Sequence, residues 1–311
     1  MNTSIIAQQN TVVYDGITED LFNRFVAFID ARPKTIETYG RALRQFFCFL
    51  SRKGITQPTR NDVIAFREEM RQTHKPGTIQ LYIIAVRQFF KWTAQEGFFP
   101  NIAENVKGAR LDREHKKGYL TSAQSKEILS SIDQSSQQGI RDYSMFSLML
   151  TTGLRTIEIA RANVEDLRTV GDSAALYIQG KGRDEKTEYV KIAAPVEKAI
   201  RDYLKALGPV EKGQPLFCSL ANKNKLKRLT TRSISRIVKT RLQAAGYDDS
   251  RLTAHSLRHT AGTLNLLHGG TLEETQQLLR HSNINTTMIY SHHLQRASNN
   301  SEARIAGAIF N

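Results

Sequence analysis

The stretch HSLRHT at residues 255–260 opens a run of helical periodicity near the C-terminus of this 311-residue chain. His255 and Arg258 are three residues apart, so both can project from one face of a helix. A second stretch, LLRHSNINTTMIY at residues 278–290, places a histidine at the end of one helix and a tyrosine nine residues later. Upstream, TTGLRTIE at residues 151–158 supplies another arginine and, one turn later, a carboxylate.

These side chains suit attack on a phosphodiester. Guanidinium groups such as Arg155 and Arg258 offer planar, permanently charged donors to the negative charge that develops on the non-bridging oxygens. A tyrosine hydroxyl is a poor nucleophile at its free pKa, so Tyr290 needs an activated phosphorus and a route for its proton. His255 can titrate near neutral pH and is the candidate proton acceptor. The pattern therefore indicates cleavage and joining of DNA strands.

Each residue also has an ordinary structural interpretation. Arg155 can simply pair with Glu158, and most tyrosines are amphipathic residues at the edge of a core. His255 and His259 are four residues apart and would suit a metal, but the zinc-protease motif needs a glutamate where this chain has Ser256. We therefore predict no metal site and expect His259 to be a structural hydrogen-bonding histidine. It is the joint occurrence of the segments that favours catalysis.

Together the segments resemble the tyrosine recombinase family, also called phage integrases, over roughly residues 20–295. The resemblance implies six catalytic residues, supported by Glu158 and His259: Arg155, Lys181, His255, Arg258, His281 and the nucleophile Tyr290. Lys181 lies in a glycine-flanked turn between predicted strands at 175–179 and 187–192, and by resemblance it protonates the leaving deoxyribose oxygen. His281 is expected to hydrogen-bond a phosphate oxygen.

The resemblance further implies a 3′-phosphotyrosyl intermediate and a Holliday junction. Neither a cofactor nor a metal is expected, because the bond energy stays in the phosphotyrosine and the sequence carries no glycine-rich phosphate loop and no paired carboxylates for two metals. Two protomers would bind each double-stranded DNA site and four would form the synapse. The apolar C-terminal residues Ile305, Ile309 and Phe310 would dock either on a neighbouring protomer or on their own domain; both alternatives stay open.

The formal net charge of +14 suits a polyanion. Double-stranded DNA fits this charge, although RNA or an anionic membrane surface would fit it too. The candidate DNA contacts are basic residues that solvated surfaces explain equally well: Lys34, Arg41, Lys75, Lys225, Lys227, Arg228 and Arg232.

The predicted fold is mostly helical with a small β-sheet. Four apolar helical faces, near residues 21–28, 36–50, 63–70 and 79–90, resemble the core-binding (SAM-like) domain that closes a clamp around DNA. We predict that this domain spans 15–107, a charged linker 108–117, and a mixed α/β catalytic domain with the C-terminal tail 118–311. Two distant cysteines and the lack of a long apolar run predict a cytoplasmic protein without a membrane segment.

Two features depart from the family or narrow it. Arg280 stands before His281, where many relatives have glycine. The helical domain begins almost at once, which favours an Xer-like or mobile-element recombinase over larger integrases with an extra arm-binding domain. The alternatives are a type IB topoisomerase and a non-catalytic DNA-binding module of the same fold. The sequence does not reveal the target site, the pathway, the host, or any accessory DNA-bending or directionality proteins.

Overall fold

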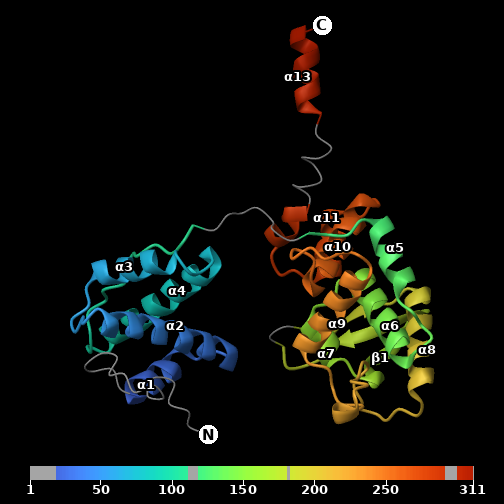
Figure 1. Cartoon of the computed structure of the whole chain (residues 1–311), viewed down its shortest axis with the longest axis horizontal. Coiled ribbons are helices and arrows are strands. Elements are labelled where there is room, and N and C mark those ends of the chain that lie inside the picture. The colour runs from blue at the N-terminus through green and yellow to red at the C-terminus, as the bar shows by residue number, and fades with distance from the viewer. Residues whose placement is uncertain (1–18, 111–117, 181–182, 291–299, 311) are drawn as a thin grey trace. The chain divides into compact units, whose positions relative to one another are not determined.

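The computed structural model describes residues 19–110, 118–180, 183–290 and 300–310. The chain divides into two compact units, Met1–Glu114 and His115–Asn311 (Figure 1). The described residues are mainly helical and include one small sheet, which confirms the predicted fold class.

Helices build the first unit: α1 (Glu19–Ile29), α2 (Pro33–Arg52), α3 (Arg60–Met70) and α4 (Pro76–Gln95). They correspond to the four predicted apolar faces. Both α2 and α4 begin with proline, whose missing N–H would be unpaired at a helix start in any case. The core between them is aromatic: the rings of Phe25 and Phe89 meet edge to face at 5.3 Å, and Phe46 meets Phe90 in the same way at 5.9 Å.

The chain that follows α4 still packs on the first unit. Val106 is buried, and the Nη1 of Arg67 donates to the carbonyl of Lys107 at 2.6 Å. Most of the predicted linker 108–117 lies outside the described residues, and the domain boundaries stay predictions.

The second unit is larger and mixes helices with strands. Its helices are α5 (Ser122–Ser131), α6 (Gln137–Thr152), α7 (Thr156–Arg161), α8 (Ala194–Leu207), α9 (Thr231–Ala244), α10 (Ala254–Leu267), α11 (Leu272–Leu279), a short helix at 285–290 and α13 (Ser301–Phe310), with single 3-10 turns at Val164–Asp166 and Asn222–Asn224. The apolar core draws on α6, α8, α9 and α10. Within this unit α6 packs against both α8 and α10 (Figure 1). The HSLRHT stretch lies in the first turns of α10.

The sheet has three antiparallel strands in the order β1 (Leu167–Val170), β2 (Ser173–Ile178), β3 (Glu188–Lys191). Strands β2 and β3 are the two that the sequence predicts, and Leu176 pairs with Val190 between them. The sequence did not predict β1, whose central residues are exposed and which pairs with β2. Strand β2 ends at Ile178 and β3 begins at Glu188, and Lys181 falls between them in sequence, outside the described residues.

Candidate active site

Arg155 stands where α6 gives way to α7. Gly153 ends α6 with a left-handed φ of +61°, a conformation that glycine adopts without strain. A Cβ atom there would come within 2.7 Å of a Leu279 methyl group, so the glycine also permits close packing. Arg155 then caps α7, with 29% of its side chain exposed. The turn thus leaves the Arg155 guanidinium partly open to a ligand.

Glu158 accepts hydrogen bonds from both the backbone and the guanidinium of Arg155. Its Oε2 accepts the backbone N–H of Arg155 at 2.7 Å, and its Oε1 accepts Nη1 of the same residue at 2.9 Å. Burial raises the pKa of Glu158, but the charges of Arg280 and Arg155 and the hydrogen bonds from Arg155 outweigh it, and the net pKa is lowered. Glu158 is therefore a buried carboxylate that keeps its charge.

Arg258 lies on α10 and is 1% exposed. Its Nη1 donates to the carbonyl of Gly153 at 2.6 Å, and its Nη2 donates to the carbonyl of Leu279. Burial, followed by the nearby charges of Arg155 and Arg280, lowers the pKa of Arg258 to about 9. The guanidinium is still charged at neutral pH, and it ties the ends of α6 and α11 together.

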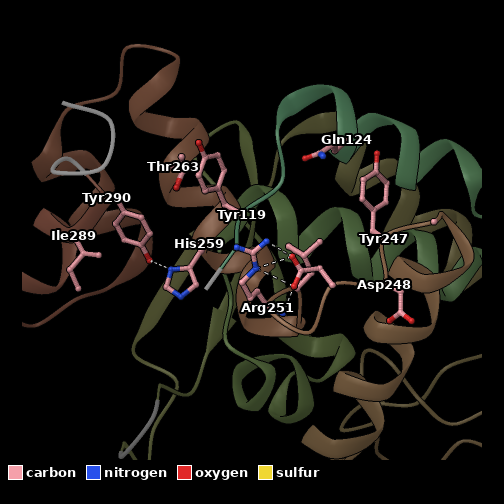
Figure 2. Close-up of a pocket in the computed structure, with 13 residues that line it drawn as sticks. Tyr119, Gln124, Tyr247, Asp248, Arg251, His259, Thr263, Ile289 and Tyr290 are labelled. Atoms are coloured by element: carbon pink, nitrogen blue, oxygen red, sulfur yellow. Dashed lines mark hydrogen bonds and ion pairs between the residues drawn. The ribbon is translucent and has the colours of Figure 1, made fainter. Parts of the chain in front are cut away.

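Tyr290 is 6% exposed, and its hydroxyl lies 2.6 Å from Nδ1 of His259. Figure 2 shows this pair at one side of a cavity of about 850 Å³ that Tyr119, Tyr247 and Arg251 also line. Burial raises the pKa of Tyr290 to about 12, although the charges of Arg258 and Arg155 pull it down. The phenol is therefore protonated at neutral pH and needs a base.

His281 lies beside the tyrosine. Its ring is nearly parallel to that of Tyr290, at 6.5 Å between centroids, and its Nδ1 lies 2.9 Å from the hydroxyl of Thr287. Burial, then the charges of Arg258 and Arg155, lowers the pKa of His281 to about 4. His281 is thus a neutral hydrogen-bonding group under ordinary conditions.

His255 is exposed at the start of α10. Its ring meets that of His259 edge to face at 4.5 Å between centroids. It also lines, with Arg155, a cavity of about 320 Å³. The structure therefore brings His255 into the same site as both Arg155 and the His259–Tyr290 pair.

Five of the six predicted catalytic residues thus gather in one site from separate segments of the second unit. Lys181, the sixth, lies outside the described residues, although the adjoining Gly180 accepts a hydrogen bond from Arg161 Nη1 at 3.4 Å. The predicted role of Lys181 stays a prediction.

Residues 118–296 match the phage integrase family, and residues 22–97 match its N-terminal SAM-like domain. The chain belongs to the phage integrase family. This integrase is 30% identical to tyrosine recombinase XerC of Caldanaerobacter subterraneus subsp. tengcongensis, over 90% of this chain and 83% of that protein. It is 27% identical to tyrosine recombinase XerD of Listeria monocytogenes, over 89% of this chain and 94% of that one.

Solved structures share the fold of this integrase. XerH site-specific recombinase, in a post-cleavage complex with a palindromic difH substrate, matches with a TM-score of 0.72 and 23% identity over 89% of this chain and 83% of that one. A lambda integrase tetramer bound to a Holliday junction matches with a TM-score of 0.65 and 15% identity, over 85% and 77% of the two chains. The family match and the XerC and XerD relatives show that the chain is a tyrosine recombinase, an enzyme of site-specific DNA recombination.

The integrase's predicted DNA contacts differ in their surroundings. Lys34 and Arg41 both pair with Glu37, at 2.6 and 2.9 Å, on an exposed face of α2. Lys75, Lys225, Lys227 and Arg232 are exposed. Arg228 instead donates to the carbonyl of Ala160 at 2.8 Å and to Oδ1 of Asn163 at 2.6 Å. Because the Arg228 guanidinium donates to these acceptors, we place Arg228 behind the other six candidates as a DNA contact.

Two contacts of the site were not predicted from the sequence. His259, expected to be structural, is the residue whose ring nitrogen meets the tyrosine hydroxyl. The sequence showed Arg280 only as an arginine where many relatives have glycine, yet its Nη2 donates to Glu158 at 2.9 Å. The one sequence signal for the latter was an arginine in a position suited to glycine.

The described parts of the chain contain no cluster of three or more His, Cys, Asp or Glu side chains that could hold a metal ion. Among the same residues, no helix is both long and apolar enough to cross a membrane.

Proposed function

We propose that this recombinase cleaves a defined double-stranded DNA site through a covalent 3′-phosphotyrosyl intermediate on Tyr290 and rejoins strands by way of a Holliday junction. The observation that carries the proposal is the convergence of Arg155, Arg258, His255 and His281 around the buried side chain of Tyr290. The XerH and lambda integrase structures, named for a DNA substrate and a Holliday junction, support it.

The arginines are proposed to activate the phosphorus. Arg155 is partly open and Arg258 is buried but charged, so together they can offer guanidinium donors to the two non-bridging oxygens. Neutral His281 would add a hydrogen bond to one of them. Fixed donors aimed at developing charge are ordinarily the largest contribution to catalysis of this kind.

The tyrosine proton is proposed to leave through histidines. Nδ1 of His259 lies within hydrogen-bond distance of the hydroxyl, and His255 contacts His259 at the exposed end of the pair. His259 would accept the proton as the phenolic oxygen bonds to phosphorus, and it would hold that proton as an imidazolium beside the His255 ring. The bond to the 5′ oxygen then breaks, and Lys181 is proposed to protonate that oxygen, which yields a free 5′-hydroxyl. No atom or electron is needed from a cofactor.

The C-terminal helix is proposed to connect protomers. No residue of α13 is buried, and Ile305, Ile309 and Phe310 are 59%, 66% and 82% exposed. An apolar face of this kind needs a surface to cover it. Four protomers on two sites would form the synapse, with α13 docked in trans. Deletion of 297–311 should weaken cooperative DNA binding, whereas unchanged cooperativity would favour docking on its own domain.

The pathway is either integration and excision of a mobile element or Xer-type resolution of chromosome dimers, with accessory DNA-bending or directionality proteins as possible further partners. The likeness to XerC and XerD favours the second pathway. Action in the cytoplasm stays a prediction.

A nicked candidate-site DNA traps the covalent step, because the short strand beyond the cleaved bond diffuses away. The protein and this DNA are incubated in EDTA and resolved on a denaturing gel beside Tyr290→Phe. We expect a protein–DNA adduct with the parent and none with the variant, at equal DNA binding. Binding without an adduct would support the non-catalytic module, and relaxation of supercoiled DNA without any preferred site would support the topoisomerase.

A further inference from the structure

Arg280 joins the end of α11 to His281 in a backbone conformation that its side chain disfavours. Its φ and ψ are +50° and +51°, the left-handed region, where glycine is free and a long side chain is strained. Strain of this kind persists when the surrounding structure gains from it, and it concentrates at functional sites. The question is therefore what the arginine side chain supplies that glycine would not.

The side chain of Arg280 turns inward and is 9% exposed. Its Nη2 donates to Oε2 of Glu158 at 2.9 Å, and its Nη1 donates to the carbonyl of Leu278 at 2.7 Å. Its Nε is buried without an acceptor among the described residues. One carboxylate contact is thus the main compensation for a guanidinium that has been taken out of water.

Glu158 is shared. The carboxylate is 1% exposed and also binds the backbone N–H and the Nη1 of Arg155. If Arg155 were its sole partner, the pair would be neutral, and Arg155 would offer a screened charge to a phosphate. With Arg280 on the other side, two guanidiniums divide one negative charge. The excess positive charge acts on Arg258, because Arg155 and Arg280 are among the charges that lower the pKa of Arg258.

We propose that Arg280 is a positioning residue for the strand-cleavage step: by engaging Glu158 it leaves the positive charge of Arg155 for the scissile phosphate. This inference rests on the proposed phosphoryl transfer to Tyr290. Arg280 itself donates to Glu158 and to the carbonyl of Leu278, so it acts on the phosphate only through the Glu158–Arg155 pair.

The alternative is that Arg280 merely staples two segments together. A substrate without the phosphate charge distinguishes these two roles. A methylphosphonate at the cleaved position removes a negative oxygen from the substrate while preserving the reaction at phosphorus. Stabilisation by charge weakens on the neutral substrate, whereas a packing role affects both substrates alike.

Three variants dissect the side chain. Arg280→Met removes the charge and keeps most of the volume, Arg280→Lys keeps the charge, and Arg280→Gly removes the side chain while relieving the backbone strain. Arg201→Met, in an exposed pair with Glu197 on α8, is the matched control for loss of one arginine from an ion pair. Thermal unfolding of each variant verifies that it is folded.

The measurement is the single-turnover rate of adduct formation on nicked DNA with either a phosphate or a methylphosphonate. We expect Arg280→Met and Arg280→Gly to slow the phosphate reaction on the order of tenfold to a hundredfold, with the loss largely absent on methylphosphonate. Arg280→Lys should recover most of the rate, and Arg201→Met should match the parent.

Equal losses on both substrates, or a parental rate for Arg280→Met, would overturn the inference while leaving the proposed function intact. If the parent protein itself forms no adduct on a site that it binds, the proposed function fails and the inference falls with it.

Discussion

The two units of this recombinase bury different kinds of side chain. In the described part of the first unit the buried residues are almost all apolar, and Thr93 is the polar exception. The second unit buries Glu158, Arg258 and His259 beside Tyr290. Burying a charge lowers stability unless the charge is paired. The first unit is therefore stabilised chiefly by apolar packing, whereas the second carries the free-energy cost of buried charged groups at its candidate site.

The largest change in stability is expected from the aromatic core of the first unit. Phe89 is fully buried and contacts the rings of Phe25, Phe47 and Trp92. Phe89→Ala should lower the free energy of unfolding by about 3–5 kcal/mol because it removes apolar surface and leaves a cavity. Phe28→Ala, at a ring that is 50% exposed, is the control and should cost far less.

Chemical denaturation measures both variants. Under conditions in which Phe89→Ala is folded, its adduct rate at saturating DNA should equal that of the parent. A cleavage defect in the folded variant would break the separation of stability from chemistry.

The second prediction concerns the buried arginine. Arg258→Met should slow cleavage roughly 10²- to 10³-fold, the size of effect seen when one fixed donor to developing charge is removed. It should also destabilise the fold by about 1–3 kcal/mol, since the carbonyls of Gly153 and Leu279 lose their donor. Arg258→Lys restores charge but cannot bridge both carbonyls, so it should recover only part of each loss. Single-turnover cleavage and thermal unfolding supply the two readouts; wild-type cleavage by Arg258→Met would contradict this assignment.

The third prediction addresses the proton of Tyr290. His259→Gln keeps a hydrogen-bond acceptor near the phenol but removes the base. Cleavage at pH 7 should fall about a hundredfold. The rate of the variant should then climb with pH, because the pKa of Tyr290 is raised to about 12 by burial and only direct ionisation remains as a route. A pH–rate profile parallel to that of the parent would mean that His259 only holds the ring.

The smallest effect is the pH dependence of stability from His281. Its pKa in the fold is lowered to about 4 by burial and nearby arginines, against about 6.5 when unfolded. The unfolded state therefore binds the proton more readily between these values, so stability is full above pH 6.5 and falls as the pH drops towards 4. Denaturant titrations at pH 7.5 and 5.0 should show a loss on the order of 1 kcal/mol after allowance for solvent screening, reduced in His281→Asn. Equal losses in both proteins would remove His281 from this account.

The contrast between the apolar first unit and the second unit with its buried polar groups explains how much of the structure the sequence could predict. Helical periodicity was enough for the four helices of the first unit, because their faces are apolar and local. The strands β2 and β3 carried their own signal, whereas the short and exposed β1 is specified by its pairing with β2.

The sequence singled out residues that the structure brings together, but it did not predict which of them contact one another. Arg155, His255, Arg258, His281 and Tyr290 stand in recognisable segments. The hydrogen bond from Tyr290 to His259 spans 31 positions, and the ion pair from Arg280 to Glu158 spans 122. Such pairings depend on how helices pack, which local pattern does not specify.

The central claim is that Tyr290 is the nucleophile. The adduct formed on nicked site DNA can be digested with protease and nuclease, and the peptide that retains a nucleotide identified by mass spectrometry. We predict the modification on Tyr290. A nucleotide on Tyr119 or Tyr247, which line the same cavity, or on any other residue would contradict the account.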